Sequence, residues 1–284
     1  MSNQFIKQFS KNYFALFGLF IVVVLVVCAI FAPFIAPFDP NEQNLAMRLL
    51  PPIYDEGANS AYILGTDDFG RDLLSRIIYG ARVSIMIGFI SVVISLAVGL
   101  VLGILAGYYG GIIDLIIMRI VDIMLAIPAI LLAIVIVAIL GPSLYNAMIA
   151  IGIVGIPTYA RIIRASVLAE KEKEYVIASR INGSSDLRLM LAVILPNCLS
   201  PIIVQATMGF ASAVLEAAGL SFLGLGAQPP LAEWGAMLSN SLQYITTAPW
   251  MILYPGLAIF LTVLGFNLIG DALTDALDPK LRSR

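Results

Sequence analysis

Long apolar runs of about 20 residues each are the feature of this sequence that most limits its possible folds. The first run, residues 13–35, contains no charged side chain. A helix needs about 20 mostly apolar residues to cross the hydrocarbon core of a bilayer. Five further runs meet this length: residues 83–108, 115–140, 144–163, 198–225 and 250–269. The chain is therefore expected to be an all-α membrane protein with six transmembrane helices.

The composition supports a membrane location. Of the 284 residues, 60% are hydrophobic and 12% are charged, whereas an average soluble domain has about 25% charged residues. A soluble fold of this length cannot bury so much apolar surface, which excludes a soluble enzyme and a disordered chain. The net charge of −2 gives no basic patch, so we expect no nucleic-acid partner. The first run is longer than the apolar region of a typical signal peptide and is interpreted as an uncleaved span.

The side chains that usually perform catalysis or bind metals are scarce. The sequence contains no histidine, and its two cysteines, Cys28 and Cys198, do not form a CxxC motif. Histidine is the commonest general base and metal ligand, and paired cysteines mark redox or zinc sites. No G-x-x-x-x-G-K-[ST] phosphate-binding loop is present either. We therefore expect no catalytic residue, no metal site and no cofactor in this chain.

Between the first two spans lies a polar segment, residues 36–82, that is rich in proline and acidic residues. Its second half has helical spacing: Thr66 can cap a helix, and apolar residues from Phe69 to Ile78 fall on one face. This pattern predicts an amphipathic helix, either lying on the membrane surface or packed on the other spans. We expect residues 1–82 to form an N-terminal module and residues 83–284 a core of five spans, with a charged loop at residues 164–197.

Small residues and prolines give further detail within the spans. Gly99, Gly103 and Gly107 are four residues apart and form one helical stripe, as do Gly209, Ala213 and Ala217. Small residues allow close contact between transmembrane helices, so both stripes predict helix–helix interfaces. Pro128 and Pro157 are expected to kink their helices, because proline removes a backbone donor.

The distribution of lysine and arginine predicts the orientation. If both termini are cytoplasmic, only four of the 16 basic residues lie outside, namely Arg48, Arg71, Arg76 and Arg82. Positively charged loops are retained in the cytoplasm, which favours this arrangement. Trp234 and Trp250 then lie on the outer side, and Trp250 suits the aromatic belt at the interface. The remaining basic residues, all cytoplasmic, are Lys7, Lys11, Arg119, Arg161, Arg164, Lys171, Lys173, Arg180, Arg188, Lys280, Arg282 and Arg284.

The charged loop at residues 164–197 has the pattern of two helices separated by a break. Gly183 suits the left-handed residue after a helix C-terminus. One of the residues 184–186 can cap the next helix, which is expected to end or bend at Pro196. This short helix would present Leu187, Leu189 and Met190 to the cytosol, an apolar ridge that requires a covering partner.

This loop resembles the EAA loop of ABC importer permeases, in which E-A-A-x3-G is followed by I-L-P. Residues 177–179 (IAS) stand at the E-A-A position, Gly183 matches the glycine, and residues 194–196 (ILP) match the end. The resemblance extends along the chain, and it identifies the C-type permease of dipeptide, oligopeptide and nickel ABC importers. The blocks that carry it are FAPFIAPFDP (31–40), LGTDDFGRDLLSR (64–76), YGAR (79–82), EYVIASRINGSSD (174–186), SFLGLG (221–226), QPP (228–230), TAPW (247–250), GD (270–271) and LDP (277–279).

The resemblance implies the type I ABC importer permease fold in the bacterial inner membrane. It also implies partners: a homologous second permease, two cytoplasmic ATPase subunits that carry ATP and magnesium, an external or periplasmic solute-binding protein, and membrane lipid. The permease itself would be non-catalytic, and its loop would couple transport to an ATPase subunit. The implied coupling residues are Ala178, Gly183, Ser184, Ser185, Asp186, Leu187, Arg188, Leu189, Met190 and Pro196.

Glu216 is an acidic residue deep within the fifth predicted span. An intramembrane carboxylate either faces the translocation path, where it meets a peptide's amino terminus, or bonds to a neighbouring helix. Arg119 and Asp122, three residues apart, are expected to form an ion pair within or between helices. Import of dipeptides or oligopeptides is the favoured function. The alternatives are import of nickel or another metal complex on the same scaffold, and an ion-driven secondary transporter, for which several buried carboxylates are typical.

Overall fold

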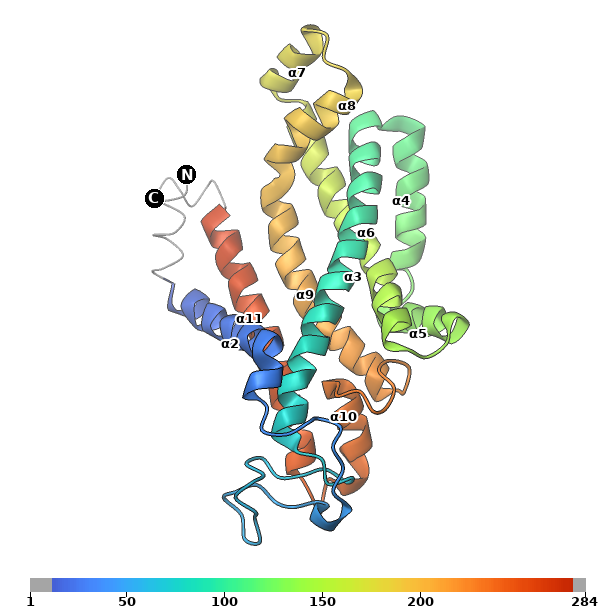
Figure 1. Cartoon of the computed structure of the whole chain (residues 1–284). Coiled ribbons are helices and arrows are strands. Elements are labelled where there is room, and N and C mark those ends of the chain that lie inside the picture. The colour runs from blue at the N-terminus through green and yellow to red at the C-terminus, as the bar shows by residue number, and fades with distance from the viewer. Residues whose placement is uncertain (1–11, 278–284) are drawn as a thin grey trace.

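The computed structural model describes residues 12–277, and this part of the chain is almost entirely helical (Figure 1). Within these described residues, five helices are long and apolar enough to cross a membrane, and one bent pair brings the number to as many as six. The all-α expectation is confirmed. The elements are α2 (Tyr13–Ile35), η1 (Leu45–Met47), α3 (Leu73–Tyr109), α4 (Gly111–Leu125), α5 (Ala129–Leu140), α6 (Leu144–Lys171), α7 (Glu174–Ile181), α8 (Asp186–Arg188), η2 (Leu189–Ile194), η3 (Leu195–Cys198), α9 (Leu199–Phe222), α10 (Trp234–Ser241), η4 (Leu242–Tyr244) and α11 (Trp250–Leu277).

The first span has the bounds that the sequence predicts. Helix α2 covers Tyr13–Ile35, and the side chain of Asn12 accepts hydrogen bonds from the backbone N–H groups of Phe14 and Ala15. This cap satisfies two of the donors that the first turn of a helix leaves free. Helix α2 lies beside α11, where Gly18 approaches Leu268 and the backbone of Gly265.

The separate amphipathic helix before the second span is a wrong prediction. Helix α3 begins at Leu73 and continues without interruption to Tyr109, through the expected boundary at residues 82 and 83. Asp72, and not Thr66 as predicted, caps it by accepting a hydrogen bond of 2.8 Å from the backbone N–H of Ser75. The Thr66 hydroxyl instead donates to the carbonyl of Met47 and accepts from the N–H of Leu50. Long-range contacts of this loop thus override its local helical spacing.

The third predicted span is divided at Pro128. Helices α4 and α5 meet there at an angle of 92°, a much sharper change of direction than the predicted kink. Pro128 occupies the N-cap of α5 in an extended conformation and cannot supply the backbone donor that would continue α4. In Figure 1, α5 projects sideways from the bundle.

Other elements differ from the predicted bounds. Helix α6 passes through Pro157 to Lys171, α11 extends beyond residue 269, and the loop at 226–249 contains the helix α10. The chain from Asp186 to Phe222 is continuous, so Pro196 neither ends nor sharply bends it. A π-helical segment, η2, precedes Pro196, and the N–H of Leu195 reaches the carbonyl of Met190, five residues back. Such a wide turn accommodates the missing proline donor without breaking the helix.

The glycine stripe of α3 forms the predicted helix–helix interface. A Cβ atom built on Gly99, Gly103 or Gly107 comes within 2.6–2.8 Å of atoms of α6. These contacts are closer than real Cβ atoms show, so only glycine permits the approach of the two backbones. The serines of α3 reinforce it: Ser95 donates to the carbonyl of Gly152 at 2.7 Å and Ser91 to that of Met148 at 3.2 Å.

The two ends of the bundle have different structures. Helices α7 and α8 lie at one end, whereas α10 and the segment 36–72 lie at the other (Figure 1). At the α10 end, the indole of Trp234 is buried against Gly80 and donates to the carbonyl of Ile77 at 3.1 Å. Trp250 is half-buried and donates to the carbonyl of Thr66. Part of the predicted orientation depends on Lys7, Lys11, Lys280, Arg282 and Arg284, which lie outside the described residues.

Candidate functional site

The helix break in the 164–197 segment is formed by Gly183, as the sequence predicts. Gly183 has a φ of +81° and follows the C-cap of α7. The N–H of Gly183 donates to the carbonyl of Arg180 at 3.0 Å, and the N–H of Ser184 donates to that of Ser179 at 3.2 Å. These two bonds define a Schellman motif, which terminates a helix at a left-handed residue. Ser185 is the N-cap of α8, although its side chain makes no capping bond.

After the break, the chain turns back into the protein. Leu189 is fully buried and Met190 is 7% exposed, where they pack with Val176 of α7 and Ile163 and Val167 of α6. The prediction that Leu189 and Met190 face solvent is therefore wrong. The cause is the direction of η2, which carries these side chains onto α6 rather than away from it.

A different set of apolar side chains is exposed at this end. Ile181 is 80% exposed and Leu187 is 64% exposed, on the two sides of the break. Ile177 and Leu191 are also exposed, and we call these four residues the apical patch. Ile177 and Ile181 belong to α7, outside the candidate spans, whereas Leu187 and Leu191 lie at the start of the candidate span Asp186–Phe222. Exposed apolar side chains at the end of a bundle are typical of an interaction site.

Tyr108, near the C-terminus of α3, contacts residues on both sides of the helix break. Its hydroxyl donates to Asp186 Oδ1 at 2.6 Å, and the guanidinium of Arg180 lies 5.7 Å from its ring centroid. Lys171 Nζ donates to the carbonyl of Gly107 at 2.9 Å, which ties the end of α6 to the end of α3. Sequence reasoning missed Tyr108, because nothing local marks its contact with residues more than 70 positions away.

Glu170 is a second residue whose role the sequence did not indicate. The alternating charges around it suggest a solvated helix face, but Glu170 is buried at the end of α6. It accepts a hydrogen bond from the Tyr175 hydroxyl and pairs with Lys173 at 2.6 Å. Desolvation and the bond to Glu170 raise the pKa of Tyr175. This cluster fixes the turn between α6 and α7.

The other predicted coupling residues lie around the break. Ala178, Ser185, Asp186, Arg188 and Pro196 are exposed. Ser184 is half-buried, and its hydroxyl lies 3.0 Å from that of Ser179. The structure thus brings most of the predicted residues to one end of the molecule, and buries two of them.

Glu216 lies at the wall of a cavity of about 230 Å³ between α3, α4, α5, α6 and α9. The carboxylate is half-buried and forms no ion pair within residues 12–277. Uncharged polar side chains line the same cavity: Ser91, Ser95, Thr158, Tyr159, Gln205 and Ser212. Apolar residues such as Val92, Leu125, Ile151 and Val154 make up much of the remaining lining, so this chamber is of mixed polarity, and Glu216 is the one acidic residue of its lining.

The ion pairs of α4 are interhelical. Asp122 pairs with Arg161 of α6 at 2.6 Å rather than with Arg119 of its own helix. Asp114 receives two hydrogen bonds from Arg164, of 2.5 and 2.6 Å. Both pairs join α4 to α6 and form no part of the cavity lining.

Comparison with known families identifies the chain. Residues 99–283 match the family described as binding-protein-dependent transport system inner membrane component. The chain belongs to this family. Residues 1–52 of the permease also match the N-terminal TM domain of oligopeptide transport permease C. The permease is accordingly a multi-pass protein of the bacterial inner membrane and a non-catalytic transport subunit. Family membership implies a second permease, ATPase subunits and a binding protein as partners.

Individual relatives are similar over nearly the whole permease. The dipeptide transport system permease protein DppC of Haemophilus influenzae is 55% identical over 98% of this chain and 95% of its own length. DppC of Escherichia coli K12 is 54% identical, with 98% and 93% covered. The di/tripeptide transport system permease protein DppC of Pseudomonas aeruginosa is 54% identical, with 99% and 92% covered.

A solved structure supports the fold. A chain of the MetNI methionine ABC transporter, in an inward-facing conformation, superposes with a TM-score of 0.59 at 21% identity. The match covers 72% of the permease and 97% of that chain. The type I ABC importer permease fold expected from the sequence is thereby confirmed.

Proposed function

We propose that this permease is the C-type membrane subunit of an ATP-driven importer of dipeptides or other short peptides. The observation that carries this proposal is the 54–55% identity to dipeptide and di/tripeptide permeases over 98–99% of the chain. It forms half of a translocation path together with a homologous second permease. An external, periplasmic solute-binding protein delivers the peptide, and two cytoplasmic ATPase subunits hydrolyse ATP with magnesium.

In this proposal both termini and the α7–α8 end are cytoplasmic. Residues 1–82 form a module beside the core of residues 83–284, and the loop at 164–197 couples the core to an ATPase subunit. The apical patch supports this role, because Ile181 and Leu187 are strongly exposed and a partner that covers them removes apolar surface from water. The coupling segment then transmits movement of the ATPase subunit through Gly183, Asp186 and Tyr108 to α3.

The cavity at Glu216 is proposed as the part of the translocation path that this subunit contributes. A carboxylate inside a membrane protein is costly unless a cation or proton offsets its charge. The ammonium terminus of a peptide supplies such a cation, and the surrounding hydroxyl groups supply acceptors for its remaining protons. The cavity lies between the helices, away from the α7–α8 end, as a substrate chamber must.

Reconstitution tests the function. The permease, its second permease and the ATPase subunits are placed in proteoliposomes, and labelled dipeptide is supplied with the binding protein. We expect uptake that requires both ATP and the binding protein. Uptake of a nickel chelate but not of peptides would favour the metal-complex alternative, and uptake driven by an ion gradient without ATP would contradict the proposal.

Two variants test the proposed sites in the same assay. Leu187→Asp should lower uptake at least tenfold and weaken ATPase binding, whereas Leu187→Met, which keeps the apolar surface, should behave as wild type. Glu216→Gln should raise the peptide concentration for half-maximal uptake about tenfold, because one charged contact is typically worth more than 1 kcal/mol. Unchanged uptake by Leu187→Asp would contradict the role of the apical patch in coupling. Unchanged uptake by Glu216→Gln would contradict the role of Glu216 in the translocation path.

A further inference from the structure

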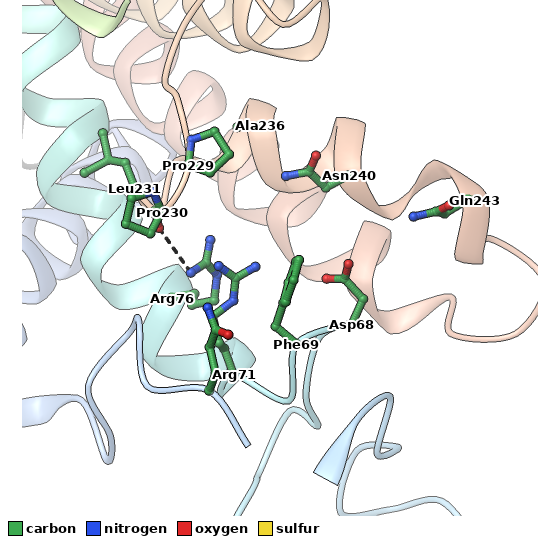
Figure 2. A pocket seen from close by; sticks show the side chains of 11 residues that line it. Asp68, Phe69, Arg71, Arg76, Pro229, Pro230, Leu231, Ala236, Asn240 and Gln243 are labelled. Carbon is green, nitrogen blue, oxygen red and sulfur yellow. Dashed lines mark hydrogen bonds between the residues drawn. The ribbon is translucent and has the colours of Figure 1, made fainter. Parts of the chain in front are cut away.

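A second cavity, of about 270 Å³, lies at the α10 end of the molecule (Figure 2). The segment 36–72, the start of α3, residues 229–231 and the α10–η4 segment form its walls. It shares no lining residue with the cavity at Glu216. The two cavities are therefore separate sites, and this one lies outside the core of the helix bundle.

Two arginines form one wall of this cavity, which we call the arginine pocket. Arg71 is 6% exposed and Arg76 is 4% exposed. Within residues 12–277, the carboxylate that pairs with them is that of Asp67: Arg71 Nε donates to Asp67 Oδ2 at 2.7 Å, and Arg76 Nε lies 3.6 Å from the same oxygen. Asp72, which is also buried, is turned toward α3 and accepts from Ser75. Two buried guanidinium groups thus share one acidic partner.

Part of their hydrogen-bonding capacity is unused within residues 12–277. Arg76 Nη1 donates to the carbonyl of Pro40 at 2.8 Å and lies 3.5 Å from that of Pro230. The Nη atoms of Arg71 and Nη2 of Arg76 make no hydrogen bond to a described residue. Figure 2 shows the two guanidinium groups close together in the middle of the pocket. Among the described residues these nitrogens are not sealed from solvent, so they are donors that face the open pocket. A carboxylate is the ligand that matches such guanidinium donors best, because it accepts charge-assisted hydrogen bonds from them.

The remaining walls do not supply an equivalent carboxylate at the arginines. Asn240 and Gln243 are neutral amides. Asp68 also borders the pocket, but the ring of Phe69 stands between it and the guanidinium groups in Figure 2. Burial and the neighbouring charge of Asp67 raise the pKa of Asp68. Phe69 in turn supports Arg71, whose guanidinium carbon lies 4.7 Å from the ring centroid.

We infer that the arginine pocket receives an aspartate or glutamate side chain from the surface of the external solute-binding protein. This inference rests on the proposed function, which places the α10 end outside the membrane. A protein side chain fits better than the carboxylate of a transported peptide, because the pocket is built from a loop and α10 and is separate from the chamber at Glu216. A guanidinium–carboxylate pair at this point fixes the register of docking.

The test measures docking of the binding protein to the complete importer in nanodiscs by surface plasmon resonance. Asn240→Asp changes one pocket amide into a carboxylate of the same shape, which adds a negative charge that repels an incoming carboxylate and leaves the pair of Arg71 and Asp67 intact. We expect the dissociation constant of the binding protein to rise at least tenfold. Arg71→Gln should have a similar effect, whereas Arg48→Gln, which removes a charge from the same loop outside the pocket lining, should dock as wild type.

The outcomes separate this inference from the proposed function. If both Asn240→Asp and Arg71→Gln fold, bind the binding protein with wild-type affinity and support normal peptide uptake, the pocket assignment alone is overturned. Weaker peptide uptake with unchanged docking would show that the pocket contacts substrate, and would also overturn it. A complementary Asp→Arg or Glu→Arg change on the binding protein that restores docking to Arg71→Asp would support it. Absence of docking to the wild-type importer would instead contradict the proposed function.

Discussion

The hydroxyl of Tyr108 donates a hydrogen bond of 2.6 Å to Asp186 Oδ1, and this bond joins the end of α3 to the first residue of α8. The two residues are 78 positions apart in the sequence. Helix α3 also packs along α6 through glycines, so the contact links α8 to the α3–α6 interface. Tyr108 is a positioning residue for the helix break, and four consequences of the structure are testable.

Tyr108→Phe should weaken coupling without loss of the fold. The variant removes the hydrogen bond to Asp186 but keeps the ring beneath Arg180. We expect the attachment of α8 to α3 to be weakened by about 1–3 kcal/mol. We expect peptide uptake per ATP hydrolysed to fall several-fold, measured in proteoliposomes. Tyr109→Phe, at the neighbouring exposed tyrosine, is the control and should match wild type. Equal coupling ratios in all three proteins would contradict the role of Tyr108.

Gly183→Val should abolish coupled transport, because a β-branched residue at a φ of +81° is strongly disfavoured. No atom lies within 4 Å of a Cβ built at this position, so the effect must come from the backbone and not from a clash. Gly183→Asn is therefore the matched control, since asparagine tolerates the left-handed region. We expect it to retain most of the uptake. If both variants fail equally, the conformational explanation is incorrect.

Gly103→Ala should lower the stability of the permease by about 1–3 kcal/mol, because its Cβ would lie 2.7 Å from the carbonyl oxygen of Ala160. Thermal unfolding in detergent, followed by circular dichroism, measures the change. Gly256→Ala in α11 is the control, since the nearest atom there is 3.9 Å away. Its melting temperature should equal or exceed that of the wild type. A stable Gly103→Ala protein would mean that α3 and α6 can separate at little cost.

The buried carboxyl group of Glu233 should make the stability of the permease depend on pH. Burial raises the pKa of this carboxyl group, which caps α10 through the N–H groups of Gly235 and Ala236. An acid with a raised pKa binds its proton more tightly in the folded state, so its stabilising contribution is present below the unfolded pKa and is lost as pH rises through the folded pKa. As the pH rises from 4 to 8, the melting temperature of the wild type should therefore fall relative to that of Glu233→Gln. A difference that stays constant over this range would show that the pKa of Glu233 is not raised.

Local sequence patterns determined much of the architecture. Apolar length placed α2 at the observed bounds, and the four-residue glycine spacing of α3 predicted its contact with α6. Gly183 marked the helix break correctly, because the requirement for a positive φ is local to one residue. The family motifs at residues 174–186 identified the type of permease for the same reason, since they are contiguous in the chain.

The tertiary structure decided what depends on residues far apart. The burial of Leu189 and Met190, the bond from Tyr108 to Asp186 and the two arginines that share Asp67 follow from how α3, α6 and the segment 36–72 meet. Likewise, the helical spacing after Thr66 gave way to long-range bonds with Met47 and Leu50. A periodic pattern specifies which side chains share a face of a helix. Which other element packs against that face depends on the packing of the whole bundle. The sequence alone therefore determined the first span, the helix break and the family, whereas the contacts around the helix break and the arginine pocket exist only in the folded chain.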